Sequence, residues 1–163
     1  MHAYTLDDWS GFVTAEVGAA AALTGLLFVA VSINLGKILE LPQLPGRAAE
    51  SLLILLGVLA AATLGLVPGQ AATTLGVELL GVSLPVWCFP ILLQVRARFP
   101  GAPPSWIWPR IIAHQFATLP MLAAGASLCA GVGGGLYWLV AGTIFSFAAA
   151  VLNAWVLLVE IQR

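Results

Sequence analysis

The chain has 163 residues, of which 61% are hydrophobic and 8% charged, and its formal net charge is −1. A soluble globular protein carries about 25% charged residues, so this composition excludes a soluble protein and predicts one that lies in a membrane. A net charge near zero also argues against nucleic acid as a partner, because binding to nucleic acid requires a basic surface.

The first predicted membrane span covers about residues 12–36. The preceding stretch, MHAYTLDDWS, lacks the basic segment of a signal peptide, so we expect this span to be retained. From Val17 to Leu35 the span is uncharged and close to the roughly 20 residues that cross a bilayer core. Small residues recur along it at every seventh position and predict a helix-packing strip, namely Gly11, Gly18, Gly25 and Ser32.

The opposite face of this span is apolar in the middle and polar at both ends. It carries Glu16, Ala20, Leu23, Leu27 and Asn34. Two interpretations stay open. In an oligomer this face could line a pore with a polar ring at each mouth and an apolar constriction between them. Alternatively, the face meets a neighbouring helix and the polar ends form hydrogen bonds there.

Four further spans are predicted at about residues 48–67, 73–95, 110–130 and 136–161. They are separated by a proline-containing loop over 37–47, the Pro68-Gly69 turn, a long proline-rich loop over 96–109 and the GVGGG turn over 131–135. In the second span, Gly57, Ala61 and Gly65 recur at a spacing of four and are predicted to pack against the small strip of the first span. Residues 1–163 thus form one all-α domain, a polytopic membrane bundle of five transmembrane helices.

Five spans place every basic residue on one side of the membrane, namely Lys37, Arg47, Arg96, Arg98, Arg110 and Arg163. Because basic residues concentrate on the cytoplasmic side, the N-terminus is predicted outside and the C-terminus in the cytoplasm.

Ionisable residues inside spans are costly and are functional hypotheses by default. Three of them are Glu16, Glu78 and His114. The two carboxylates have similar predicted depths, so they could share a proton or bind a cation. The alternative is structural, because both lie in the first two turns of their helices, where the helix dipole stabilises an acid.

The other polar residues within the spans have structural explanations too. His114 has no second histidine or cysteine at ligand spacing and is therefore not a metal motif. Asn153 belongs to a small, polar face of the fifth span that is typical of helix packing and could also line a pathway.

No Cys-x-x-Cys pair, glycine-rich phosphate loop or catalytic Ser/His/Asp set is found in the sequence. We therefore expect neither an enzyme nor a cofactor.

The run GAAAALTGLLFVAVSINLGKIL, followed by LPQLPGRAAESLLILL and LVPGQ, resembles a group of small actinobacterial membrane proteins with several spans. The likeness covers the first two spans. It implies a location in the bacterial cytoplasmic (inner) membrane, and it implies no particular activity and no functional residues.

These observations favour a small membrane protein that conducts ions or small solutes. Glu16, Glu78, Asn34, His114 and Asn153 are its candidate transport or ion-binding residues. The alternative is a non-conducting accessory or regulatory subunit of a larger membrane complex. Small-residue strips on several spans exceed what one small bundle needs for internal packing, so a homo-oligomer in the lipid bilayer is predicted.

Overall fold

The structure is a computed structural model and describes residues 2–41, 43–96 and 108–162. These residues form helices and turns, with no strand among them. The helices in chain order are η1 (His2–Tyr4), η2 (Leu6–Trp9), α1 (Ser10–Ile33), α2 (Leu35–Glu40), α3 (Leu44–Gly65), α4 (Ala72–Arg96), α5 (Trp108–Ala130) and α6 (Tyr137–Gln162). Among the described residues, five helices are long and apolar enough to cross a membrane. The prediction of an all-α chain with five apolar helices is thereby confirmed.

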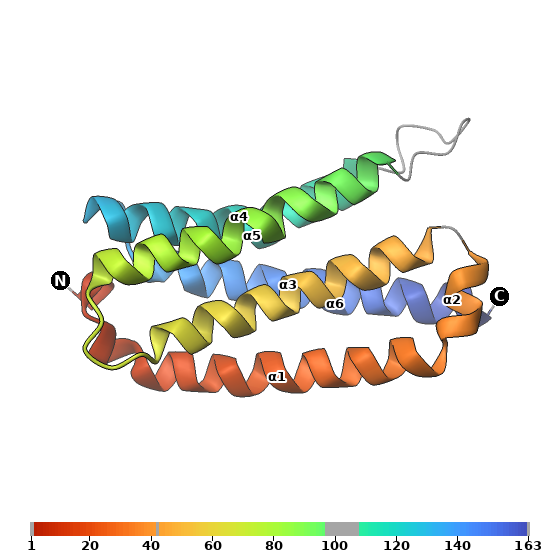
Figure 1. The fold of residues 1–163 in the computed structure, drawn as a ribbon, viewed down its shortest axis with the longest axis horizontal. Coiled ribbons are helices and arrows are strands. Elements are labelled where there is room, and N and C mark those ends of the chain that lie inside the picture. The colour runs from red at the N-terminus through yellow and green to blue at the C-terminus, as the bar shows by residue number, and fades with distance from the viewer. Residues whose placement is uncertain (1, 42, 97–107, 163) are drawn as a thin grey trace.

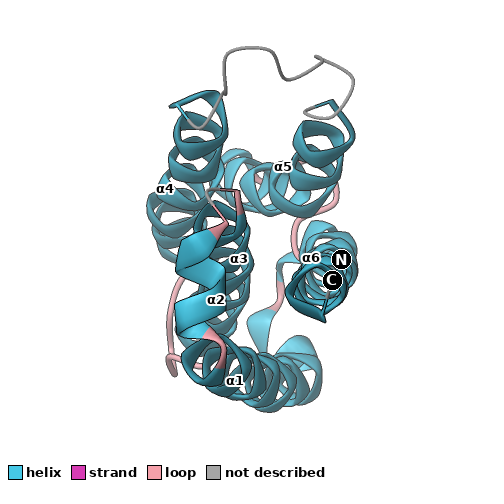
Figure 2. Ribbon diagram, turned by 90° about the vertical axis from the view of Figure 1, so that its right-hand side faces the viewer, coloured by secondary structure: helices cyan, strands magenta, loops and turns pink. Residues whose placement is uncertain are grey.

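The long helices run side by side along the longest axis of the molecule (Figure 1). The N-terminus lies beside the turns that follow α3 and α5, and we call this the N-terminal end of the bundle. The short helix α2 and the C-terminus mark the opposite end, called the C-terminal end. Extensive contacts join α4 to α5, α5 to α6, α1 to α3, and α3 to both α4 and α6. Helix α1 lies at the edge of the bundle (Figure 2).

The helix boundaries in the structure differ from the predicted ones at both proline-containing loops, over residues 37–47 and 96–109. Residues 37–47 were expected to be a loop, but α2 occupies its first part and α3 begins at Leu44 with Pro45 in its first turn. Pro109 likewise lies in the first turn of α5. Proline is tolerated there because the first turn has no backbone hydrogen-bond partner to lose. Most of the other predicted loop, residues 97–107, lies outside the described residues.

Glycine lets the central helices approach closely at two crossings. A β-carbon on Gly76 of α4 would lie 2.9 Å from the carbonyl oxygen of Gly125 on α5. A β-carbon on Gly142 of α6 would lie 2.7 Å from Cγ of Met121 on α5. Since protein interiors are close-packed, a side chain at either crossing would push the helices apart. The closeness of α4, α5 and α6 therefore depends on these glycines.

The segment before α1 is tied to the turn between α5 and α6. The Leu136 amide donates a hydrogen bond to the Ala3 carbonyl at 2.9 Å, and the Gly134 amide donates to the Tyr4 hydroxyl at 3.1 Å. The rings of Trp9 and Tyr137 meet edge to face with their centroids 4.9 Å apart. These contacts fix the start of α1 against the N-terminal end of α6.

Candidate functional site: a buried charged cluster at the C-terminal end

The most strongly polar site in the described residues is centred on Glu50, which is only 2% exposed. Its Oε1 accepts a hydrogen bond of 2.8 Å from Nε2 of Gln94 on α4. Its Oε2 accepts a charge-assisted bond of 2.9 Å from the guanidinium of Arg110 on α5. Because a buried carboxylate is stable only when it is paired and hydrogen-bonded, these contacts explain how Glu50 is tolerated in the bundle.

His114 completes this site, which we call the charged cluster (Glu50, Gln94, Arg110 and His114). His114 as a whole residue is 1% exposed. Its Nδ1 lies 3.5 Å from Oε1 of Glu50, and its Nε2 lies 3.1 Å from the backbone carbonyl oxygen of Trp87 on α4. The indole of Trp87 in turn donates to Oε1 of Gln115 at 2.7 Å. The cluster thus joins α3, α4 and α5.

The ends of three helices position the charged cluster. Glu50 and His114 lie in the second turns of α3 and α5, and Gln94 lies in the last turn of α4. An apolar layer follows one turn further into the bundle, formed by Ile54, Val86, Ala117 and Ala149. The cluster therefore lies near the C-terminal end and is separated from the bundle centre.

Glu50, Arg110 and Gln94 were not among the candidate residues from sequence, whereas His114 was. A signal existed for the first two. Glu50 falls inside the second predicted span, and Arg110 begins the fourth, which starts at the same predicted side of the membrane. Two opposite charges at one depth can pair, but only the three-dimensional structure shows that α3 and α5 bring them together.

Glu16 lines a cavity of about 10 Å³ between α1 and the bundle, together with Phe12, Val13, Val58, Ala61, Ala62, Met121, Leu139 and Thr143. One of its carboxylate oxygens has no hydrogen-bond partner among the described residues. A volume of this size corresponds to about one water molecule. The cavity around Glu16 is thus mostly apolar, and its volume is too small for a solute.

Glu78 has different surroundings. Its carboxylate accepts a hydrogen bond from the side-chain amide of Gln70, in the turn before α4. Gln70 and Glu78 are not among the residues around the Glu16 cavity. The two carboxylates, for which a shared site was one of two interpretations, therefore have different neighbours and do not line one cavity.

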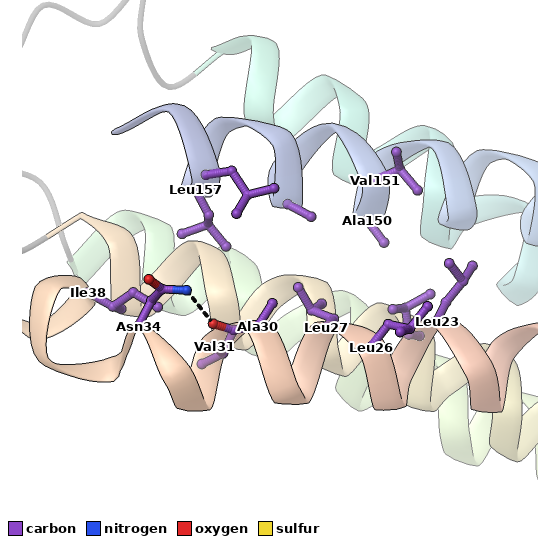
Figure 3. A pocket seen from close by; sticks show the side chains of 13 residues that line it. Leu23, Leu26, Leu27, Ala30, Val31, Asn34, Ile38, Ala150, Val151 and Leu157 are labelled. Atoms are coloured by element: carbon purple, nitrogen blue, oxygen red, sulfur yellow. Dashed lines mark hydrogen bonds between the residues drawn. The ribbon is translucent and has the colours of Figure 1, made fainter. Parts of the chain in front are cut away.

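Asn34 lies between the end of α1 and the start of α2, and its side-chain amide donates a hydrogen bond to the carbonyl oxygen of Ala30 at 2.9 Å. It lines one end of an apolar groove of about 210 Å³ between α1 and α6 (Figure 3). The walls of the groove are formed by Leu23, Leu26, Leu27, Ala30, Val31, Ile38, Leu55, Ala150, Val151, Ala154, Leu157 and Leu158. Asn153 is half-buried on the same helix α6 and is not among these residues.

The predicted packing strips have unequal environments. A β-carbon on Gly57 of α3 would lie 2.9 Å from Cγ2 of Val86, and one on Gly65 would lie 3.2 Å from Cγ1 of Val13. Ala61 between them is 3% exposed. These residues therefore form recesses for valine side chains of α4 and α1, and the small strip of α1 is not their neighbour.

The small strip of α1 faces away from the bundle. No atom lies within 4 Å of a β-carbon built on Gly11, Gly18 or Gly25. Ser32 is exposed, and its hydroxyl donates to the carbonyl of Phe28 in its own helix. The opposite face packs inward instead, since Ala20 is 0% and Leu27 is 7% exposed. Of the two interpretations of this face, contact with a neighbouring helix is therefore the one that fits Ala20 and Leu27.

Within the described part of the chain, no three His, Cys, Asp or Glu side chains gather closely enough to hold a metal ion. Comparisons with models of known families, with curated proteins and with solved structures find no match to this chain. The class that the fold and site define is therefore a structural one: a bundle of five apolar helices with a buried Glu–Arg–His cluster at one end.

Proposed function

We propose that the protein is a non-conducting membrane subunit that assembles with a second copy of itself through the outward face of α1. The observation that carries this proposal is the composition of that face in the first half of the helix. All exposed residues from 10 to 25 are small: Ser10, Gly11, Thr14, Ala15, Gly18, Ala19, Ala21, Ala22 and Gly25. Lipid provides no hydrophobic drive for association, so close backbone approach through small residues takes its place.

The other outward faces of the bundle support this reading by contrast. Helix α6 exposes Trp138, Phe145 and Trp155, and α5 exposes Ile112 and Phe116. Such bulky apolar side chains suit contact with lipid tails. The first half of α1 exposes none, and its small strip repeats at intervals of seven residues. That interval keeps one seam in register along two supercoiled helices, so two copies of α1 can pair face to face about a two-fold axis.

We further propose that the C-terminal end of the bundle faces the cytoplasm and that the bundle lies in a bacterial inner membrane. Lys37, Arg47 and Arg110 all lie at the C-terminal end of the bundle, on α2 and at the starts of α3 and α5, whereas Asp7 and Asp8 lie at the N-terminal end. By the positive-inside rule, the C-terminal end faces the cytoplasm. The resemblance to small actinobacterial membrane proteins supports a bacterial inner membrane as the location, and a larger membrane complex there is a further candidate partner.

Energy transfer between two fluorescently labelled copies in liposomes tests the proposal. Replacing Gly18 and Gly25 by leucine is expected to weaken association at least tenfold, about 1.4 kcal/mol. The matched control replaces Ala126 and Ala148 by leucine. These two residues are exposed on α5 and α6, so their replacement should leave association unchanged. Energy transfer that is absent in the wild type, or unaffected by the two glycine substitutions, would refute pairing through α1.

Conduction of ions or small solutes is the second candidate function. The charged cluster favours it, because ionisable residues inside membrane helices commonly mark transport pathways. Flux into proteoliposomes discriminates between the two functions. A non-conducting subunit gives no flux above that of empty liposomes, whereas a transporter gives flux that changes in Glu50→Gln. Glu16→Gln tests in the same assay whether the α1 face contributes to a pathway.

A further inference from the structure

The imidazole of His114 lies between two groups that can only accept hydrogen bonds. Nε2 faces the backbone carbonyl oxygen of Trp87 at 3.1 Å, and Nδ1 faces Oε1 of Glu50 at 3.5 Å. A neutral imidazole carries a single N–H. It can therefore donate to one of these oxygens only, and it directs a lone pair of electrons at the other.

Three neighbouring donor groups are engaged with atoms other than Nδ1 of His114. Gln94 donates to Oε1 of Glu50 at 2.8 Å, Arg110 donates to Oε2 at 2.9 Å, and the Thr118 hydroxyl donates to the backbone carbonyl of His114 at 2.7 Å. Among the described residues, Nδ1 of His114 has no hydrogen-bond partner. With its side chain 0% exposed, the ring cannot turn this nitrogen to bulk water, and a buried polar atom left without a partner is costly.

We propose that Glu50 and His114 form a proton-binding site. One proton from the aqueous phase binds to the lone pair of Nδ1 and lies between this nitrogen and Oε1 of Glu50. The ring then carries two N–H groups, one for the Glu50 carboxylate and one for the Trp87 carbonyl. No other bond forms or breaks. The bound proton converts a contact between two acceptors into an ion pair with a hydrogen bond.

The surroundings fit a site that exchanges protons with the C-terminal end. The charged groups on the neighbouring elements are Glu50 and Arg47 of α3, Arg110 of α5, and Glu160 of α6, which interacts electrostatically with Arg47. Helix α4 contributes the neutral Gln94 and the Trp87 carbonyl. The Arg110 side chain is 20% exposed, so the cluster reaches the surface beside this residue. The two bonds of the charged ring hold α5 to both α3 and α4.

Nitrogen NMR of the histidine ring tests the site in the full chain, reconstituted in phospholipid nanodiscs. His2→Asn removes the signal of the second histidine. At pH 7.5 a free histidine side chain, half-protonated near pH 6.5, is about 90% neutral. We expect two N–H groups on His114 at this pH, and the loss of one of them in Glu50→Gln. Glu78→Gln, the matched control at the other end of the bundle, should retain both.

A single N–H on wild-type His114 at pH 7.5 would overturn the proposal, as would two N–H groups that persist in a folded Glu50→Gln variant. If Glu50→Gln does not fold, raising the pH of the wild type decides the matter. The second N–H must then disappear in one step while that of the Trp87 contact remains. The measurement reports on the ring alone, so its outcome is independent of whether α1 pairs with a second copy.

Discussion

Gly76 of α4 packs directly against Gly125 of α5, and a β-carbon on Gly76 would lie 2.9 Å from the Gly125 carbonyl oxygen. Gly76→Ala is therefore expected to lower the free energy of unfolding by about 1–3 kcal/mol, because the backbone of α5 must move to admit the methyl group. Unfolding in mixed detergent micelles, with increasing SDS, measures the change.

Gly81 offers a control on the same helix, since no atom lies within 4 Å of a β-carbon built there. Gly81→Ala should leave stability unchanged or raise it by up to about 1 kcal/mol, because alanine favours the helix over glycine. Equal effects of the two substitutions would show that the α4–α5 crossing is not a tight contact.

Gly135 has a φ of +51°, and its backbone lies against the carbonyl of Ala3. Gly135→Ala is expected to detach the segment before α1, which would become accessible to protease. Gly131→Ala is the control, because Gly131 also has a positive φ (+68°) but no atom near its β-carbon position. Both variants carry the backbone strain of alanine at positive φ. Faster cleavage before Ser10 is expected in Gly135→Ala alone.

The Ser127 hydroxyl accepts a hydrogen bond of 2.7 Å from the Gly135 amide and donates to the carbonyl of Val132. Ser127→Ala leaves that amide without its partner and should cost about 1–3 kcal/mol. Amide hydrogen exchange at Gly135 is expected to accelerate. Ser32→Ala is the comparison, since that hydroxyl is exposed and donates to the Phe28 carbonyl of its own helix. An equal loss of stability there would contradict a specific role for Ser127.

Arg110→Met should lower the free energy of unfolding by about 3 kcal/mol, the low end for a broken buried ion pair. The low end applies because Arg110 is partly exposed, while the Glu50 carboxylate stays buried without its cation. Lys37 is an exposed basic residue at the same end of the bundle, and Lys37→Met should change the free energy of unfolding by less than about 0.5 kcal/mol.

A double-mutant cycle tests the ion pair directly. Arg110→Met should lower the free energy of unfolding much less when Glu50 has already been replaced by glutamine. Purely additive losses would mean that Arg110 and Glu50 do not interact.

Sequence patterns predicted the helices well because their signal is local. Length without charge identifies an apolar helix, and Pro68-Gly69 and GVGGG end helices wherever they occur. The short helix α2 was not predicted, because Pro42 and Pro45 suggested a loop over the whole of residues 37–47.

The direction in which α1 faces could not be read from its residues. The strip of Gly11, Gly18 and Gly25 and the face of Ala20 and Leu27 are both compatible with packing. Only the contacts of α1 with α3 decide that the second face is buried. For Glu16 and Glu78, equal depth along two helices suggested a shared site, but depth says nothing of the rotation of each helix about its own axis.

By itself the sequence determined an all-helical chain with five apolar segments of membrane-spanning length and basic residues at one end. These properties follow from composition and spacing along one helix at a time. The tertiary structure alone decided that Glu50 meets Arg110 and His114, and that the glycines of α1 stay uncovered. Such contacts depend on how helices far apart in the chain are rotated and packed against each other, and the packing of the whole bundle sets that rotation.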